Sequence, residues 1–159
     1  MPKTRSKTNA IELLKEDHAK VKKAFKEFKN MDRSDTESCC QLIAGVCEDL
    51  KVHTTLEEEI FYPAVRAAIE DEDLMNEAAV EHETAKLLIE QLENAGPDDP
   101  SYYATFTVLG EYVMHHVKEE EGEMFPEAKQ ASELDLDALG EQMKARKQEL
   151  IGQTAAGVT

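Results

Sequence analysis

The sequence contains few of the residues that interrupt helices or favour strands. Of its 159 residues only seven are glycine and five proline, and the only aromatic residues are four tyrosines and five phenylalanines. Leucine, alanine, glutamate and lysine are abundant, so the composition favours helix over sheet throughout. A chain of this length makes one domain with a substantial core.

Basic side chains are also scarce. Eighteen lysines and arginines stand against 34 aspartates and glutamates, a formal charge of −16. Nucleic acids and anionic membrane surfaces attract basic proteins, so we expect neither as the main partner. No stretch approaches the roughly 18 apolar residues of a membrane span, and the polar start lacks the apolar run of a secretory signal. The sequence therefore predicts a cytoplasmic protein.

Cysteine is too rare for a disulfide framework. The three cysteines are an odd number, and none forms a Cys-x-x-Cys pair, a spacing used by metal and redox sites. Cys40 and Cys47, seven residues apart, share a face if they lie on one helix. We expect buried free thiols.

The chain does contain strong helical periodicity. Four long segments place apolar residues three and four apart, and short polar or Pro/Gly-rich connections separate them. These segments cover residues 10–30, 36–69, 73–94 and 102–131, and a shorter amphipathic one covers 134–151. Long helices with short connections favour an all-α fold, an antiparallel up-and-down four-helix bundle with a short extra C-terminal helix.

The expected domain boundaries follow from these segments. They are a flexible N-terminal tail at 1–9, the bundle at 10–131, the C-terminal helix at 132–151 and a flexible tail at 152–159. We expect no second domain, so a sensing role requires a separate protein partner. The basic N-terminal tail and the extra helix are candidate docking elements for such a partner.

The second and fourth helical segments carry the same motif. HTTLEEEIFYP and HVKEEEGEMFP each place a glutamate four residues, and a proline ten residues, after a histidine. Residues four apart lie on one helix face, which gives two pairs of potential metal ligands, His53 with Glu57 and His116 with Glu120. The proline removes a backbone hydrogen bond, so we expect each helix to bend just beyond its ligand pair and then continue.

Each predicted helix of the bundle has one histidine on its apolar face. These histidines are His18, His53, His82 and His116. A single core histidine is usually satisfied by hydrogen bonds, but four of them near mid-helix, two with a glutamate in register, indicate a shared metal site. The fifth, His115, lies about 100 degrees off that face and is expected to face solvent or to support a ligand.

The ligand types narrow the choice of metal. Imidazole suits iron, zinc, copper and nickel, whereas magnesium and calcium prefer oxygen ligands. Four imidazoles with two carboxylates exceed the needs of one tetrahedral zinc ion. With Glu57 and Glu120 as bridges and two histidines on each metal, the set predicts a dinuclear centre with open positions for O2, NO, peroxide or water.

At this point the chain resembles a known family, the hemerythrin-like or HHE cation-binding domain. The resemblance covers about residues 10–131 and is carried by KEDHAKV, HTTLEEEIFYP, EHETAKLL and HVKEEEGEMFP. It implies a four-helix bundle around two iron ions joined by an oxo or hydroxo bridge. It also implies the terminal ligands His18, His53, His82 and His116 and the bridging ligands Glu57 and Glu120.

Two departures from the family pattern bear on function. Oxygen-carrying hemerythrins have a histidine where this chain has Ala78, and they usually have an aspartate, at a longer spacing, where it has Glu120. One iron then has one imidazole fewer, and water or Glu81 is a candidate replacement. Asp49 and Tyr112, each four residues before a ligand, are candidates to support the site.

Three functions therefore remain open from the sequence. The first is a di-iron protein that binds O2, NO or peroxide for sensing, detoxification or iron handling, because the altered ligand set disfavours reversible O2 carriage. The second is a di-iron oxidoreductase that consumes peroxide or NO at the position left open beside Ala78. The third is a structural or interaction bundle with zinc or no metal.

Overall fold

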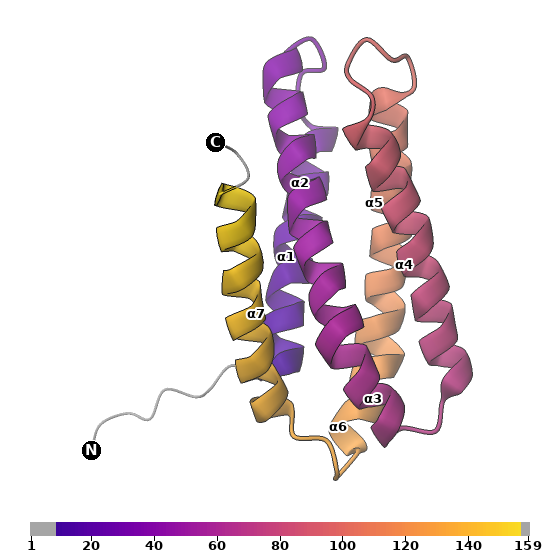
Figure 1. Ribbon diagram of the computed structural model, residues 1–159. Helices are drawn as coiled ribbons and strands as arrows, with labels where there is room; N and C mark the ends of the chain where they lie inside the picture. Colours follow the sequence, from indigo (N-terminus) through magenta and orange to yellow (C-terminus); the bar gives the residue numbers. More distant parts are fainter. Residues whose placement is uncertain (1–8, 157–159) are drawn as a thin grey trace.

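The computed structural model describes residues 9–156, and every regular element in that range is helical. The four long helices lie side by side and run alternately up and down (Figure 1). The helices are α1 (Ala10–Lys29), α2 (Thr36–Leu56), α3 (Tyr62–Ala68), α4 (Glu72–Glu93), α5 (Tyr102–Glu119), α6 (Phe125–Gln130) and α7 (Leu136–Ala156). The predicted all-α bundle with an extra C-terminal helix is confirmed.

The predicted tails are only partly within the described residues. Residues 1–8 and 157–159 lie outside them. Residues 152–156, which we expected in a flexible tail, instead continue α7. The C-terminal helix is therefore longer than its sequence pattern indicated.

Short acidic and amide side chains fix where three helices begin. The side chain of Asn9 accepts a hydrogen bond from the backbone N–H of Glu12, and Asp35 and Asp71 cap α2 and α4 in the same way. Such caps satisfy backbone donors that the first helical turn leaves without partners. The histidine of each helix is thereby held at a defined number of turns from a fixed start.

Two π-helical turns interrupt the helices at the repeated motif. They are η1 (Glu57–Phe61), between α2 and α3, and η2 (Glu120–Met124), between α5 and α6. Pro63 and Pro126 lie in the first turn of the helix that follows each of them. A proline ring clashes with the carbonyl four residues earlier in a regular α-helix, and the wider π turn gives it room. The helix continues past each proline, as predicted, and each π turn begins at a predicted ligand.

The core consists of two apolar clusters, one toward each end of the bundle. The loop-end cluster lies toward the α1–α2 and α4–α5 connections, and the α7-end cluster lies toward α3, α6 and α7. In the loop-end cluster the ring of Phe106 lies 5.0 Å from that of Phe25 and 4.7 Å from that of Phe28. Gly110 allows this close packing, because a Cβ there would lie 2.9 Å from the Phe25 ring.

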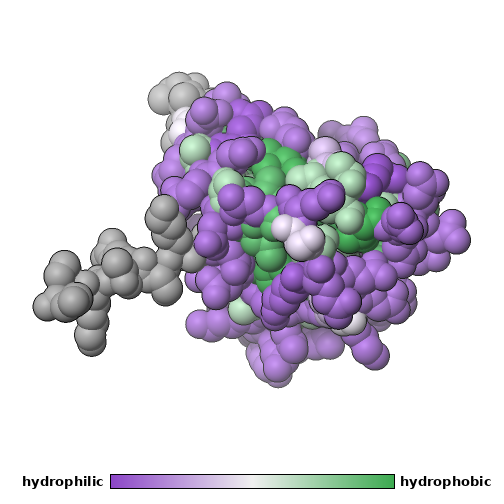
Figure 2. Space-filling view, turned by 90° about the horizontal axis from the view of Figure 1, so that it is seen from below, coloured by the Kyte–Doolittle hydropathy of each residue, from purple (hydrophilic) through white to green (hydrophobic). Residues whose placement is uncertain are grey.

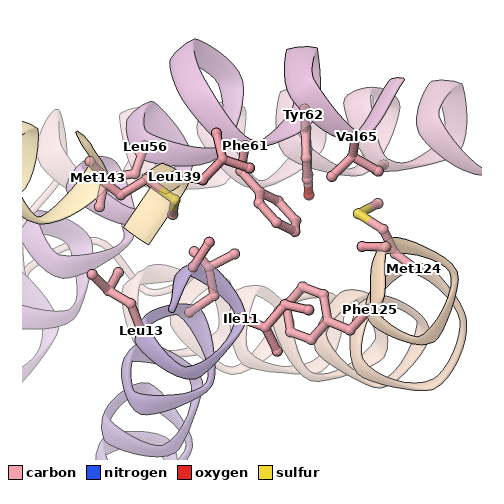
Figure 3. Close-up of a cluster of buried hydrophobic side chains, with 14 of the residues drawn as sticks. Ile11, Leu13, Leu56, Phe61, Tyr62, Val65, Met124, Phe125, Leu139 and Met143 are labelled. Atoms are coloured by element: carbon pink, nitrogen blue, oxygen red, sulfur yellow. The ribbon is translucent and has the colours of Figure 1, made fainter. Parts of the chain in front are cut away.

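Helix α7 packs against its own bundle. It lies along α1 and α2 in Figure 1, and it buries Leu139 and Met143 in the α7-end cluster, which Figure 3 shows in close-up. Arg146 of α7 binds Glu59 through two hydrogen bonds, of 2.8 and 3.3 Å. The extra helix, a candidate docking element for a partner, thus covers part of the domain itself.

The surface is mostly hydrophilic. Figure 2, seen from the lower end of the bundle, shows apolar side chains near the centre of that face with hydrophilic side chains around them. Among residues 9–153 the exposed large apolar side chains are Val80, Leu87, Val108, Tyr112 and Ile151. No helix within the described part of the chain is long and apolar enough to cross a membrane.

We expect Phe106→Ala to destabilise the metal-free protein strongly. Phe106 is fully buried and contacts two other rings, so its removal leaves a cavity and should cost about 3–5 kcal/mol in the free energy of unfolding. Urea denaturation in the presence of a chelator measures this cost. Val108→Ala, on the same helix at a more exposed position, should cost far less, and equal losses would contradict the packing described here.

Candidate metal centre

A layer of polar side chains separates the two apolar clusters. Each of the four long helices contributes one histidine to this layer, and each π turn contributes its first glutamate. Glu57 and Glu120 are at most 1% exposed. The six predicted ligands, which the structure brings together, are His18, His53, Glu57, His82, His116 and Glu120.

These six side chains form two groups of four that share both glutamates. The first group adds His18 and His53 to the glutamates, and the second adds His82 and His116. Within each group the ligand atoms lie within 4.8 Å of one another. Two carboxylates common to two histidine pairs are the arrangement that bridges two cations.

The distances within the groups suit metal coordination. The Nε2 atoms of His53 and His82 lie 3.2 and 3.0 Å from the same oxygen, Glu57 Oε1. His18 Nε2 lies 3.2 Å from Glu120 Oε1, and His116 Nε2 lies 2.9 Å from Glu120 Oε2. Two atoms that each lie about 2.1 Å from one metal ion are about 3 Å apart when their bonds meet at a right angle.

Several polar atoms of this layer have no hydrogen-bond partner among the described residues. They include His18 Nε2, Glu57 Oε2 and Glu120 Oε1. The close approach of His18 to Glu120 therefore lacks the geometry of a hydrogen bond. Buried polar atoms without partners are costly, and bound cations would satisfy them. The residues present thus fit a pair of metal ions.

An acidic side chain lies at the outer nitrogen, Nδ1, of every histidine ligand. The Nδ1 atoms of His53, His82 and His116 hydrogen-bond to Asp17, Glu58 and Glu81 at 3.0, 3.3 and 3.2 Å. His18 Nδ1 lies 3.4 Å from Glu121 without hydrogen-bond geometry. Such carboxylates orient metal-binding imidazoles and make them better donors.

These four carboxylates follow a cyclic pattern. Each stands directly beside a ligand in the sequence but contacts the histidine of another helix. Asp17 of α1 reaches α2, Glu58 after α2 reaches α4, Glu81 of α4 reaches α5, and Glu121 after α5 reaches α1. Sequence reasoning missed three of them and misplaced Glu81. An acid directly beside one proposed ligand of each motif, next to His18, Glu57, His82 and Glu120, was the signal available for finding them.

The supporting residues expected from spacing do not have the expected roles. Asp49 pairs with Lys20 near the surface at 3.3 Å. Glu81 does not replace a missing ligand, because it contacts the outer nitrogen of His116. Tyr112 is partly exposed and lines a cavity beside the histidines. His115 is largely exposed and pairs with Glu119 at 3.1 Å, in line with its position off the apolar face.

Tyr62 is a part of the site that the sequence did not reveal. Its hydroxyl donates a 2.6 Å hydrogen bond to Glu120 Oε2 and lies 3.1 Å from the Nε2 atoms of both His82 and His116. In Figure 3 its side chain points from its helix toward the bundle interior. The phenol oxygen thus lies beside the group formed by Glu57, His82, His116 and Glu120, on the helix pair that includes Ala78.

A small apolar cavity lies on the other side of the histidines. It has a volume of about 30 Å³. All four histidine ligands line it, and its apolar wall belongs to the loop-end cluster. The apolar wall residues are Val21, Leu50, Ala85, Val113 and Val117. A space of this size holds a molecule of one to a few atoms.

Comparison with known proteins assigns the family. The Hemerythrin HHE cation binding domain matches residues 9–128. The chain belongs to this family. A solved structure of a hemerythrin HHE cation-binding domain-containing protein from Mycobacterium kansasii has a TM-score of 0.76 at 26% identity, with 93% of this chain and 90% of that one covered.

A second relative of the HHE domain is a longer protein. A DNA nickase from Nostoc is 30% identical over 117 residues, which are 74% of this chain. The match spans only 32% of the nickase. The chain therefore corresponds to about a third of that relative's length.

The charges of the HHE domain favour protonated histidines when no metal is bound. Burial alone lowers the pKa of His53, but Glu57 and the hydrogen bond that His53 donates to Asp17 outweigh it and raise the pKa to about 10. Burial is likewise outweighed at His116, where Glu120 and Glu81 raise the pKa to about 11. Protons on these imidazoles take the place of cations beside the buried carboxylates.

Metal binding should therefore release protons. A coordinating imidazole must be neutral, so at pH 7 the loss of protons from His53 and His116 should free about two protons per chain. Because protons compete with the metal, apparent affinity should rise with pH from 6 to 9. Calorimetric titration in buffers of different ionisation enthalpy counts the protons, and heats independent of the buffer would contradict the prediction.

Proposed function

We propose that this HHE domain is a non-haem di-iron protein whose centre binds O2, NO or peroxide for sensing, detoxification or iron handling. The observation that supports it most is the pair of four-residue groups that share Glu57 and Glu120. His18 and His53 would hold one ion, and His82 and His116 the other. Both carboxylates would bridge the two ions.

The donor set favours iron over zinc. Two imidazoles and two bridging carboxylates would give each ion four donors, and the nearby phenol oxygen of Tyr62 would give one ion a fifth, more than tetrahedral zinc requires. The three free cysteines, which soft metals would favour, lie on α2 away from the metal-ligand groups. Iron would supply open coordination positions and a change of oxidation state.

The cavity supports a small ligand. Its apolar wall favours a molecule that carries little charge, and its volume excludes organic substrates of ordinary size. O2, NO and hydrogen peroxide meet both conditions. Tyr112, partly exposed and lining the cavity, stands between it and solvent.

Consumption of peroxide or NO is a second candidate function, and Tyr62 is the observation that favours it. The hydroxyl of Tyr62 touches a bridging carboxylate and two histidines, so it can hold a proton inside the ligand shell. Burial raises the pKa of this hydroxyl well above 10, and the nearby charges of Glu120 and Glu57 add to the effect. A buried proton donor beside the centre suits turnover better than simple storage.

The nickase relative does not extend this proposal to nucleic acid. Its name describes a whole protein of which this chain matches 32%. The formal charge of −16 opposes binding to a phosphate backbone. We therefore propose that the protein is cytoplasmic and has no nucleic acid or membrane partner. If its role is sensing, it acts through a separate protein partner.

Iron binding tests the proposal directly. Anaerobic reconstitution followed by metal analysis should give about two iron ions per chain, and exposure to air should produce the absorption of an oxo-bridged centre. Glu57→Gln and Glu120→Gln should each lower the iron content, whereas Glu59→Gln, two residues later in the same π turn but exposed, should not. Unchanged metal content in the first two variants would instead support a structural bundle that binds zinc or no metal.

The cavity is tested by filling it. Val113→Ile adds one methylene to a wall of a space of about 30 Å³, so we expect azide to bind the ferric protein about tenfold more weakly, with iron content unchanged. The control is Val108→Ile, on the same helix but outside the cavity lining. Visible absorption during azide titration gives both affinities. Equal affinities in the two variants would place the ligand elsewhere.

A further inference from the structure

Helix α7 reaches a metal-ligand histidine through two successive hydrogen bonds. Lys147 Nζ donates to Asp17 Oδ1 at 2.7 Å, and the other oxygen of Asp17 lies 3.0 Å from His53 Nδ1. Asp17 is 14% exposed at its side chain, so this chain of contacts is largely shielded from solvent. Lys147 lies beyond residue 128, where the match to the HHE family ends.

The outer carboxylates differ in which cations support them. Glu58 binds Lys86 of α4, and Glu81 lies near the imidazole of His115 of α5, so the partners of both carboxylates on the His82/His116 side come from within the bundle. On the other side, no lysine or arginine is found at Glu121 among the described residues, and the cation at Asp17, Lys147, comes from α7. The two halves of the centre are thus supported from different parts of the chain.

We propose that Lys147 is a positioning residue that tunes the metal held by His18 and His53, acting through Asp17. The inference rests on the proposed metal centre. An anionic acceptor at Nδ1 makes the opposite nitrogen of an imidazole a stronger donor. The ammonium group of Lys147 neutralises part of the negative charge of Asp17, and so limits how far Asp17 can increase the donor strength of His53. The extra helix is then a regulator of the centre as well as a cover for the bundle.

This arrangement predicts opposite effects at its two ends. Lys147→Met removes the cation that neutralises part of the charge of Asp17, so His53 becomes a stronger donor. A stronger donor stabilises the more oxidised state of the metal and lowers its midpoint potential. Asp17→Asn gives His53 a neutral partner and raises the potential. Simple loosening of the site would not produce shifts of opposite sign from these two substitutions.

Two further variants separate tuning from attachment of α7. Arg146→Met removes one positive charge from the neighbouring position and breaks the ion pair of α7 with Glu59, but leaves Asp17 and His53 intact. It should leave the potential unchanged. Lys147→Arg should restore the wild-type potential, and Lys147→Gln repeats the charge removal with a polar side chain.

The experiment is spectroelectrochemical titration of the iron-loaded full chain, with circular dichroism to confirm folding. The proposal is overturned if the Lys147→Met and Arg146→Met potentials agree, or if the Lys147→Met and Asp17→Asn shifts have the same sign. A wild-type protein without redox-active iron would instead refute the proposed function. In that case Co2+ affinities of the same variants test the same contacts. Asp17→Asn should bind Co2+ about tenfold more weakly than the wild type. Lys147→Met should bind Co2+ more tightly, and equal affinity in Lys147→Met and Arg146→Met would again overturn the proposal.

Discussion

The burial of Glu57 and Glu120 is the constraint on which the rest of the structure depends. Two carboxylates almost without solvent exposure, at the centre of an apolar bundle, are tolerable only if cations or protons surround them. When the site is free of metal, Glu57 and Glu120 raise the pKa of His53 and His116, which favours protons on these two imidazoles. Metal ions compensate the same charges in exchange for those protons. The stability of the bundle and the metal occupancy of its centre are therefore coupled, because both depend on compensation of the negative charges of Glu57 and Glu120.

The cyclic pairing of acids and histidines extends this constraint to the whole bundle. Each helix presents a ligand inward and, one residue away, a carboxylate to the histidine of another helix. A shift of one helix along its axis by one turn, about 5.4 Å, would break contacts on both sides of it at once. The apolar clusters alone specify register less sharply, because leucine, valine and phenylalanine pack in several ways. The polar layer therefore fixes the alignment that the apolar clusters make stable.

The sequence predicted the elements and the inner ligands because both depend on local spacing. Helical periodicity located all five long segments. One histidine per apolar face and a glutamate four residues after two of them located the six side chains that the structure brings together. Contacts that depend on the relative rotation and height of two helices were not predictable in this way. Asp49 and Tyr112 were chosen as supports by intrahelical spacing, whereas the supporting carboxylates come from other helices. Tyr62 was missed for a related reason, since the π turn before it changes the direction of every later side chain.

The π turns also give the metal layer two unlike faces. On the side of the histidines toward α7, the widened turns place Tyr62 against Glu120 and the ring of Phe125 against His18, and Phe61 packs on Phe125 behind them. Above the histidines the helices are regular, and the short side chains of Val113 and Ala85 leave the cavity open. An extra residue in a helical turn pushes side chains inward on one side only, so the same feature that brings the glutamates to the centre also closes one approach to it. Space for a small molecule therefore lies on the loop-end side, where the four histidines, and not Glu57 or Glu120, line the cavity.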